Sequence, residues 1–138
     1  MSHPDGLPDL FLDRSLGRIK VPRLLRVAGL RLITLSEHYG IPADEGVADD
    51  EWLELAGHRG WIVFMKDTRI RHNRAEREAV KAHRVRCFCL ANQNLAGDEM
   101  ATRFLANLAA IERACEKPGP FIYAVHQTRI EQLTLGDR

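Results

Sequence analysis

The chain has 138 residues, a length that fits one domain, and its 45% hydrophobic and 28% charged residues are typical of a globular protein. The formal net charge of +1 excludes a protein that binds nucleic acid through an overall positive field. Three cysteines cannot make a disulfide framework, and the chain begins with proline, aspartate and glycine where a signal peptide has its apolar core. We therefore expect one domain over residues 1–138, located in the cytoplasm and without a membrane span.

The first expected elements are a strand, a helix and a second strand. Residues 9–12 form a short apolar run that predicts a strand. The segment 21–29 has apolar residues at helical spacing, with Pro22 in its first turn and a glycine at its end, and it predicts a helix. The run "LRLITL" (30–35) predicts the second strand, and a long loop is expected over 36–48.

The middle of the chain continues the alternation. The segment 49–60 has an acidic first turn, an apolar side and a terminal glycine, which indicate a helix. The run "WIVFM" (61–65) is continuously apolar, which is typical of a strand covered on both faces. The segment "NRAEREAVKAH" (73–83) predicts another helix, with Asn73 as its N-cap and Glu76 three residues later, as in a capping box.

The last third of the chain adds a strand at 85–90, the longest helix at 97–117, a strand at 120–125 and a short final strand at 130–135. The alternation predicts an α/β fold, a three-layer αβα sandwich with a mostly parallel central sheet and right-handed crossovers. The apolar face of the longest helix suits the core and a homodimer interface equally well, so both interpretations stay open.

Polar residues directly follow the expected strands. Ligands of open α/β sheets bind at the carboxyl ends of the strands, so these residues are the candidates for a functional site. They are Asp13 and Arg14 after the first strand, Ser36, Glu37 and His38 after the second, Lys66, Asp67, Arg69 and Arg71 after the third, and Asn92, Gln93 and Asn94 after the fourth. Asp49 opens the helix between the second and third strands, and Asp50 is its register alternative.

Several carboxylates at one rim would repel one another, and a divalent cation removes that repulsion. All-oxygen ligands suit Mg²⁺ or Mn²⁺ rather than zinc. Each aspartate also has a purely structural interpretation: Asp13 as a turn or helix cap, Asp49 as an N-cap, and Asp67 as the ion-pair partner of neighbouring bases. Cys87 and Cys89 lie in a strand and are expected in the core rather than at a metal.

Four segments, taken in order, resemble the small PIN-like domains, in particular the VapC-type toxin ribonucleases of toxin–antitoxin systems. They are "LFLDRSLG", "DDEWLELAGHRGWIVFMKDTRI", "NLAGDEMATRFL" and "PGPFIYAVH". The resemblance covers about residues 9–133, the core of the expected PIN-like domain. The most specific part is D-x-x-W/I-L-x-x-A followed by a strand that ends in K/T-D. The PIN fold is similar to the sandwich expected from the alternation.

The resemblance implies a metal-dependent endoribonuclease that hydrolyses RNA phosphodiester bonds. Such a protein is the toxin of a type II pair and is held by a cognate antitoxin protein. The residues that match the family's catalytic and metal-binding positions, with Mg²⁺ or Mn²⁺ as the cofactor, are Asp13, Asp49 and Asp67. The residues that would bind RNA phosphates are Arg14, Lys66, Arg69 and Arg71.

The chain departs from the family pattern at a fourth acidic position, which many PIN domains have after the next strand. Only Asn92, Gln93 and Asn94 are found there. The glutamate often found in the helix after the second strand is also missing, and Glu37 is its expected substitute. These departures favour an alternative function, a catalytically inert PIN-like module that binds a partner protein or RNA.

Overall fold

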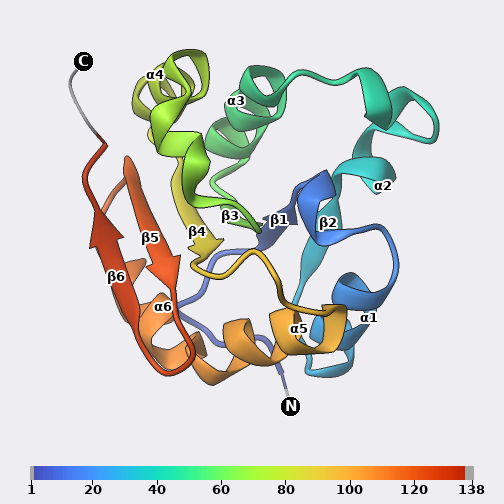
Figure 1. The fold of residues 1–138 in the computed structure, drawn as a ribbon, viewed down its shortest axis with the longest axis vertical. Coiled ribbons are helices and arrows are strands. Elements are labelled where there is room, and N and C mark those ends of the chain that lie inside the picture. The colour runs from blue at the N-terminus through green and yellow to red at the C-terminus, as the bar shows by residue number, and fades with distance from the viewer. Residues whose placement is uncertain (1, 136–138) are drawn as a thin grey trace.

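Within residues 2–135, which the computed structural model describes, six strands form one sheet in the order β2-β1-β3-β4-β5-β6 (Figure 1). The strands are β1 (Leu10–Leu12), β2 (Leu32–Thr34), β3 (Ile62–Met65), β4 (Arg86–Leu90), β5 (Phe121–Val125) and β6 (Ile130–Leu133). The first five run parallel, and β6 pairs with β5 in the antiparallel direction. The mostly parallel sheet expected from the alternation is therefore confirmed.

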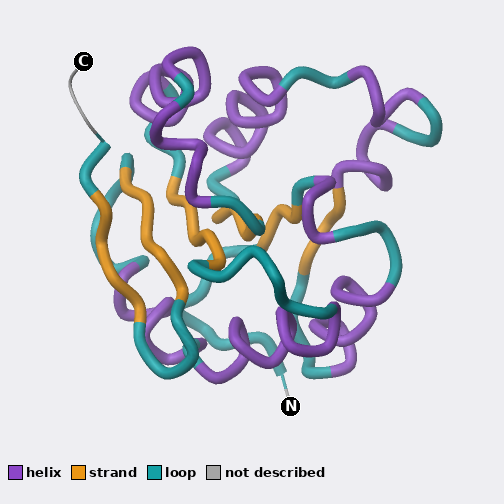
Figure 2. The backbone as a smooth tube through the Cα atoms, in the orientation of Figure 1, coloured by secondary structure: helices purple, strands orange, loops and turns teal. Residues whose placement is uncertain are grey.

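Helices and short 3-10 turns connect the strands (Figure 2). The helices are α1 (Lys20–Val27), α2 (Leu35–Tyr39), α3 (Asp49–Arg59), α4 (Arg74–Ala82), α5 (Gly97–Ala106) and α6 (Leu108–Ala114), and the turns are η1 (Arg14–Leu16), η2 (Ala43–Gly46) and η3 (Thr68–His72). Asn73 caps α4 as predicted, because its side chain accepts the backbone N–H of Glu76 at 3.0 Å. Across the described residues, no helix has the length and apolar character needed to cross a membrane.

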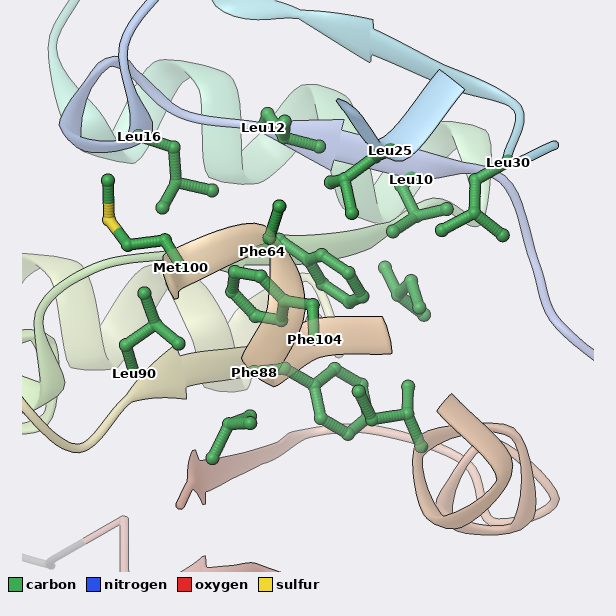
Figure 3. Packing of buried hydrophobic residues seen from close by; sticks show 14 of the residues in the cluster. Leu10, Leu12, Leu16, Leu25, Leu30, Phe64, Phe88, Leu90, Met100 and Phe104 are labelled. Atoms are coloured by element: carbon green, nitrogen blue, oxygen red, sulfur yellow. The ribbon is translucent and has the colours of Figure 1, made fainter. Parts of the chain in front are cut away.

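Each strand sends alternate side chains into two hydrophobic layers, so both faces of the sheet are covered. On one face, Leu12 and Phe64 pack with α1, α5 and α6, and the ring centroids of Phe64 and Phe104 are 4.1 Å apart (Figure 3). On the other face, Phe11 stacks on Trp52 of α3, and α4 continues this layer. The three-layer αβα sandwich is confirmed, and the two helical layers lie above and below the sheet in Figure 1.

The expected long helix over 97–117 is wrong as one element, because it breaks at Asn107 into α5 and α6. The buried Asn107 side chain donates hydrogen bonds to the carbonyl of Arg103 at 2.8 Å and to that of His126 at 2.8 Å. The second bond ties the break to the loop after β5. The apolar residues Met100 and Phe104 lie in the core of the same chain, so this pattern needs no second copy.

The expected loop over 36–48 is also more ordered than its sequence indicated. It contains α2 and η2, and α2 begins with a capping box in which Thr34 and Glu37 exchange side-chain and backbone hydrogen bonds.

One crossover differs in hand from the others. The connection from β3 to β4 places α4 on the face that α3 covers, whereas the connection from β4 to β5 advances in the same direction and places α5 and α6 on the opposite face. The expectation of uniformly right-handed crossovers is therefore wrong for this connection. With α3 and α4 covering one face, α5 and α6 help α1 to cover the other, where the large rings of Phe64 and Phe88 are buried.

The strand order reverses between β1 and β3, since the chain leaves β1 toward β2 and leaves β3 toward β4. Ligands of open parallel sheets bind at such a switch point, outside the carboxyl ends of the strands. The next residues along these two strands are the polar residues that follow Leu12 and Met65, so the topology places them at the binding end of the molecule.

Candidate active site

A cleft of about 340 Å³ lies at the carboxyl ends of β1 and β3. Its lining residues are Asp13, Arg14, Ser15, Asp49, Met65, Asp67, Arg69, Ile70, Asn73 and Glu76. The three aspartates that the sequence singled out therefore meet in one cleft, although they are far apart in the chain. A larger hollow of about 440 Å³ lies along α1, but only arginine and apolar side chains line it, so it offers no nucleophile or acid.

Asp13 and Asp67 occupy equivalent positions after neighbouring strands. Each is the N-cap of a 3-10 turn, and each accepts the backbone N–H of the residue two positions later, Ser15 at 3.1 Å and Arg69 at 2.8 Å. The structural interpretation as caps is therefore correct for both. It does not compete with a functional interpretation, because both residues also line the cleft.

Asp13 is buried, with 7% of its surface exposed. The Ser15 hydroxyl donates to Oδ1 of Asp13 and accepts the backbone N–H of Lys66 at 3.0 Å, so Ser15 links the ends of β1 and β3. Burial raises the pKa of Asp13 from its ordinary value of 3.8 to about 7; the hydrogen bonds from Ser15 oppose this rise and the charge of Asp49 adds to it. Asp13 is thus a carboxyl group whose ionised form is poorly compensated.

Asp49 is the first residue of α3, and Ala48 is the N-cap, so the prediction of Asp49 as N-cap is wrong. The indole N–H of Trp52 donates to Oδ1 of Asp49 at 2.9 Å, which holds this carboxylate at the cleft. The register alternative, Asp50, is exposed and does not line the cleft.

Glu76 is the acidic residue that the sequence interpretation missed. It lies in the first turn of α4 and lines the cleft, and its carboxyl group contacts that of Asp49 through a hydrogen bond. Burial, this contact and the charges of Asp49, Asp13 and Asp67 raise its pKa from 4.5 to about 7. The spacing from Asn73 had suggested a capping box, but the backbone N–H of Asn73 donates to the carbonyl of Ile70 instead, so the Glu76 side chain is free to face the cleft.

Asp67 differs from the other three carboxylates because a guanidinium group binds it. The Nε and Nη2 atoms of Arg69 both lie 2.6 Å from Oδ2 of Asp67. These contacts hold the pKa of Asp67 below its ordinary value of 3.8.

The remaining expected RNA-binding bases are not equivalent. Arg14 lines the cleft, and its Nη2 donates to the carbonyls of Asp44 at 3.1 Å and Val47 at 2.6 Å, which fixes its position; its Nη1 lies 3.9 Å from Asp49. Lys66 and Arg71 are half-buried and do not line the cleft.

The residues after β2 and β4 do not join the cleft. Glu37 forms the capping box of α2 and an ion pair with Arg26 at 2.7 Å, so it does not act as the expected substitute ligand. Gln93 donates to the carbonyl of Lys66 at 3.2 Å, which fastens the 92–94 loop beside β3. Cys87 and Cys89 are free and fully buried in the core, as expected.

The donor set of the cleft fits a hard divalent cation. Its four carboxylates face only two guanidinium groups, so two negative charges remain when all are ionised. Oxygen donors are the ligands that Mg²⁺ and Mn²⁺ prefer. Over residues 2–135, no three His, Cys, Asp or Glu side chains approach closely enough to hold one ion. In this arrangement Asp67 is paired with Arg69, and Asp49 and Asp13 accept hydrogen bonds from Trp52 and Ser15.

The sequence matches the model of a family described as "PIN like domain" over residues 8–92, more than half of the chain. It is 46% identical over 124 residues to a protein of Mycobacterium tuberculosis (strain ATCC 25618 / H37Rv) named "Putative ribonuclease VapC45", and the match covers 90% of each chain. No solved structure matches the chain significantly.

Proposed function

The chain belongs to the PIN-like domain family, of the VapC type, and from this premise we propose that it is a metal-dependent endoribonuclease that hydrolyses RNA phosphodiester bonds. One observation carries the proposal: a cleft at the topological switch point gathers Asp13, Asp49, Asp67 and Glu76. The relative from Mycobacterium tuberculosis is named a ribonuclease, which supports the same activity.

We propose that Asp13, Asp49 and Asp67 hold Mg²⁺ or Mn²⁺, with Glu76 as the fourth carboxylate. When bound, the cation supplies positive charge that stabilises the phosphate during hydrolysis. Glu76 comes from α4 rather than from the segment after β4, where the family pattern placed the fourth acid. Its presence removes the main reason for the inert binding module, which was the apparent lack of that acid.

The residues of the chain prepare the cleft for attack by water on a phosphodiester. Ser15 holds Asp13, and Trp52 holds Asp49, so both carboxylates have fixed positions before substrate arrives. Asp49 and Glu76 lie side by side and can orient a water molecule toward the phosphorus. Arg14 is anchored by two carbonyls, so its guanidinium offers a preorganised positive charge beside Asp49.

RNA would be bound mainly through its phosphates. Arg69 is exposed at the cleft, and Lys66 and Arg71 extend the positive charge along the end of β3. Contacts with the backbone fix the position of the strand but do not select a base sequence. Affinity should therefore fall steeply as the salt concentration rises.

The proposal extends to the biological setting that the family implies. As a toxin of a type II pair, the protein would act on cytoplasmic RNA and would be inhibited by a cognate antitoxin protein that covers the cleft. Three free cysteines fit a reducing compartment.

Cleavage of single-stranded RNA in Mn²⁺ tests the proposed activity. Asp13→Asn should lower the rate by about a hundredfold or more, because it removes one charge from the cation site without changing the size of the side chain. Asp50→Asn is the matched control, since Asp50 is adjacent to Asp49 but lies outside the cleft. Wild-type protein that cuts no RNA, or Asp13→Asn protein that cuts at the wild-type rate, would contradict the proposal.

A further inference from the structure

Arg69 engages both oxygens of Asp67. Its backbone N–H donates to Oδ1 at 2.8 Å, and its Nε–H donates to Oδ2 at 2.6 Å, with Nη2 at the same distance from Oδ2. The guanidinium group therefore binds Oδ2, one of the two oxygens through which Asp67 could bind a cation.

The other carboxylates of the cleft are held differently. Asp13 accepts its hydrogen bonds at Oδ1 alone, and Asp49 accepts a neutral indole N–H. The guanidinium nearest to Asp49 belongs to Arg14 and is 3.9 Å away. Among the carboxylates that line the cleft, Asp67 is thus the one that already has a close positive partner.

The ion pair of Arg69 and Asp67 is exposed to solvent and can dissociate at little cost in free energy. The Arg69 side chain is 82% exposed, whereas that of Asp67 is 26% exposed. An ion pair with so much exposed surface contributes little net stability, because water and salt screen it. The backbone bond from Arg69 to Oδ1 does not involve the guanidinium, so the turn can keep its shape when the side chain swings away.

We propose that Arg69 and the divalent cation compete for Asp67, and that the displaced guanidinium then binds a phosphate of the RNA. This inference rests on the proposed function, because it concerns the cation and the substrate of the same cleft. In this account Arg69 neutralises Asp67 before the cation arrives and binds a phosphate of the substrate afterwards.

The chemistry of arginine suits this exchange. A guanidinium group offers planar pairs of N–H donors that match a carboxylate and a phosphate equally well, and it stays charged in both positions. Because Arg69 lines the cleft, a short movement of its side chain suffices to pass from one partner to the other.

Calorimetric titration with Mn²⁺ tests the competition directly, on wild type, Arg69→Gln, Arg69→Lys and Arg74→Gln. Removing the competitor should tighten Mn²⁺ binding roughly two- to fivefold in Arg69→Gln, the range set by an exposed ion pair. Arg69→Lys keeps the positive charge but loses the planar pair of N–H donors. Its affinity for Mn²⁺ should therefore lie between those of wild type and Arg69→Gln. Arg74 is exposed and lies outside the cleft, which makes Arg74→Gln the control for a simple loss of positive charge.

A second arm measures binding of a phosphorothioate RNA of about 12 nucleotides by fluorescence anisotropy. With Mn²⁺ present, Arg69→Gln should bind this RNA more weakly than wild type, whereas without Mn²⁺ the two should differ less. If Arg69→Gln loses the same share of its RNA affinity with and without Mn²⁺, the proposed exchange is overturned.

The outcomes separate this inference from the proposed function. If wild type binds Mn²⁺ and Arg69→Gln binds it equally or more weakly, the competition is overturned and the cation site stands. If Arg74→Gln tightens Mn²⁺ binding as much as Arg69→Gln does, the competition is also overturned. The loss of any nearby positive charge would then explain the tighter binding. If neither wild type nor Arg69→Gln binds Mn²⁺ while both are folded, the cation site and the competition fail together.

Discussion

The turns after β1 and β3 share a capping pattern but differ in their electrostatics. Both begin with an aspartate that caps a 3-10 turn and accepts the N–H of the residue two positions later. That residue is Ser15 in the first turn and Arg69 in the second. Asp13, buried beside a hydroxyl group, has a raised pKa, whereas Asp67, beside a guanidinium group, has a lowered one. Burial raises the pKa of Asp13 although Ser15 opposes it, whereas the Arg69 guanidinium lowers the pKa of the less buried Asp67.

The largest expected effect is a pH dependence of stability that comes from the carboxyl groups with raised pKa values, Asp13 and Glu76. Asp13 and Glu76 have pKa values of about 7 in the folded protein, so the folded protein holds these protons more tightly than the unfolded chain. Stability should fall as the pH rises from the ordinary carboxyl pKa of about 4 toward about 7. For the metal-free protein we expect the Tm to drop by roughly 6 °C between about pH 5 and about pH 7.5.

Thermal unfolding followed by circular dichroism in a single mixed buffer measures this drop. Saturating Mn²⁺ should remove most of it, because the cation compensates the ionised carboxylates. Asp67 contributes on the other side of the interval, since its lowered pKa gives stability that is lost below about pH 4. A Tm that stays level or rises across the interval would show that the two carboxyl groups are not strained.

Isosteric substitutions of the two aspartates should shift stability in opposite directions. At about pH 7.5, Asp13→Asn removes a buried, poorly compensated charge and should raise the Tm of the metal-free protein by about 4 °C. Asp67→Asn keeps a capping residue but loses the ion pair with Arg69, so the Tm should fall by about 1 °C. Differential scanning calorimetry of both variants beside wild type checks the signs. If the Tm of both variants shifts in the same direction, the two turns do not differ in electrostatics as we expect.

Glu76 sharpens the comparison because burial and its acidic neighbours both raise its pKa, although its side chain is only half-buried. Glu76→Gln should raise the Tm of the metal-free protein by about 2 °C and weaken Mn²⁺ binding by about tenfold. A residue that merely supports the fold would lower the Tm instead. Glu78→Gln on the same helix is the matched control, because Glu78 is exposed and lies outside the cleft, and it should change neither quantity.

The smallest expected effect concerns the positive charges of the second turn. Arg71 is half-buried and lies outside the cleft, so its contribution is one phosphate contact at most. Arg71→Gln should lower the slope of log affinity for single-stranded RNA against log salt by about 0.7 and leave the Tm nearly unchanged. An unaltered slope would mean that Arg71 is a structural residue only.

The strands and the positions of Asp13 and Asp67 at the rim of the sheet could be predicted from the sequence because the information is local. Continuous apolar runs mark the strands, and a charge at the end of such a run marks the rim of the sheet. The turns themselves are also local, since Asp13 and Asp67 each bond to a residue two positions away.

Other features depend on contacts that the local pattern does not contain. Asn107 ends α5 because it bonds to the loop after β5, far along the chain. Glu76 looked like half of a capping box, because its spacing from Asn73 is the one that such a box requires. Its place in the cleft follows from the packing of α4 beside α3, which brings it against Asp49. The opposite hand of the crossover from β4 to β5 likewise depends on long-range packing, because α5 and α6 join the layer opposite α3 and α4.

The most direct test of the central claim is calorimetric titration of wild type, Asp13→Asn and Asp67→Asn with Mn²⁺ in one buffer. If the two turns contribute to a single cation site, wild type binds Mn²⁺ and both variants lose binding or weaken it by about tenfold or more. Wild-type affinity in both variants, or no binding by folded wild-type protein, would contradict the claim that these aspartates form a metal-dependent active site.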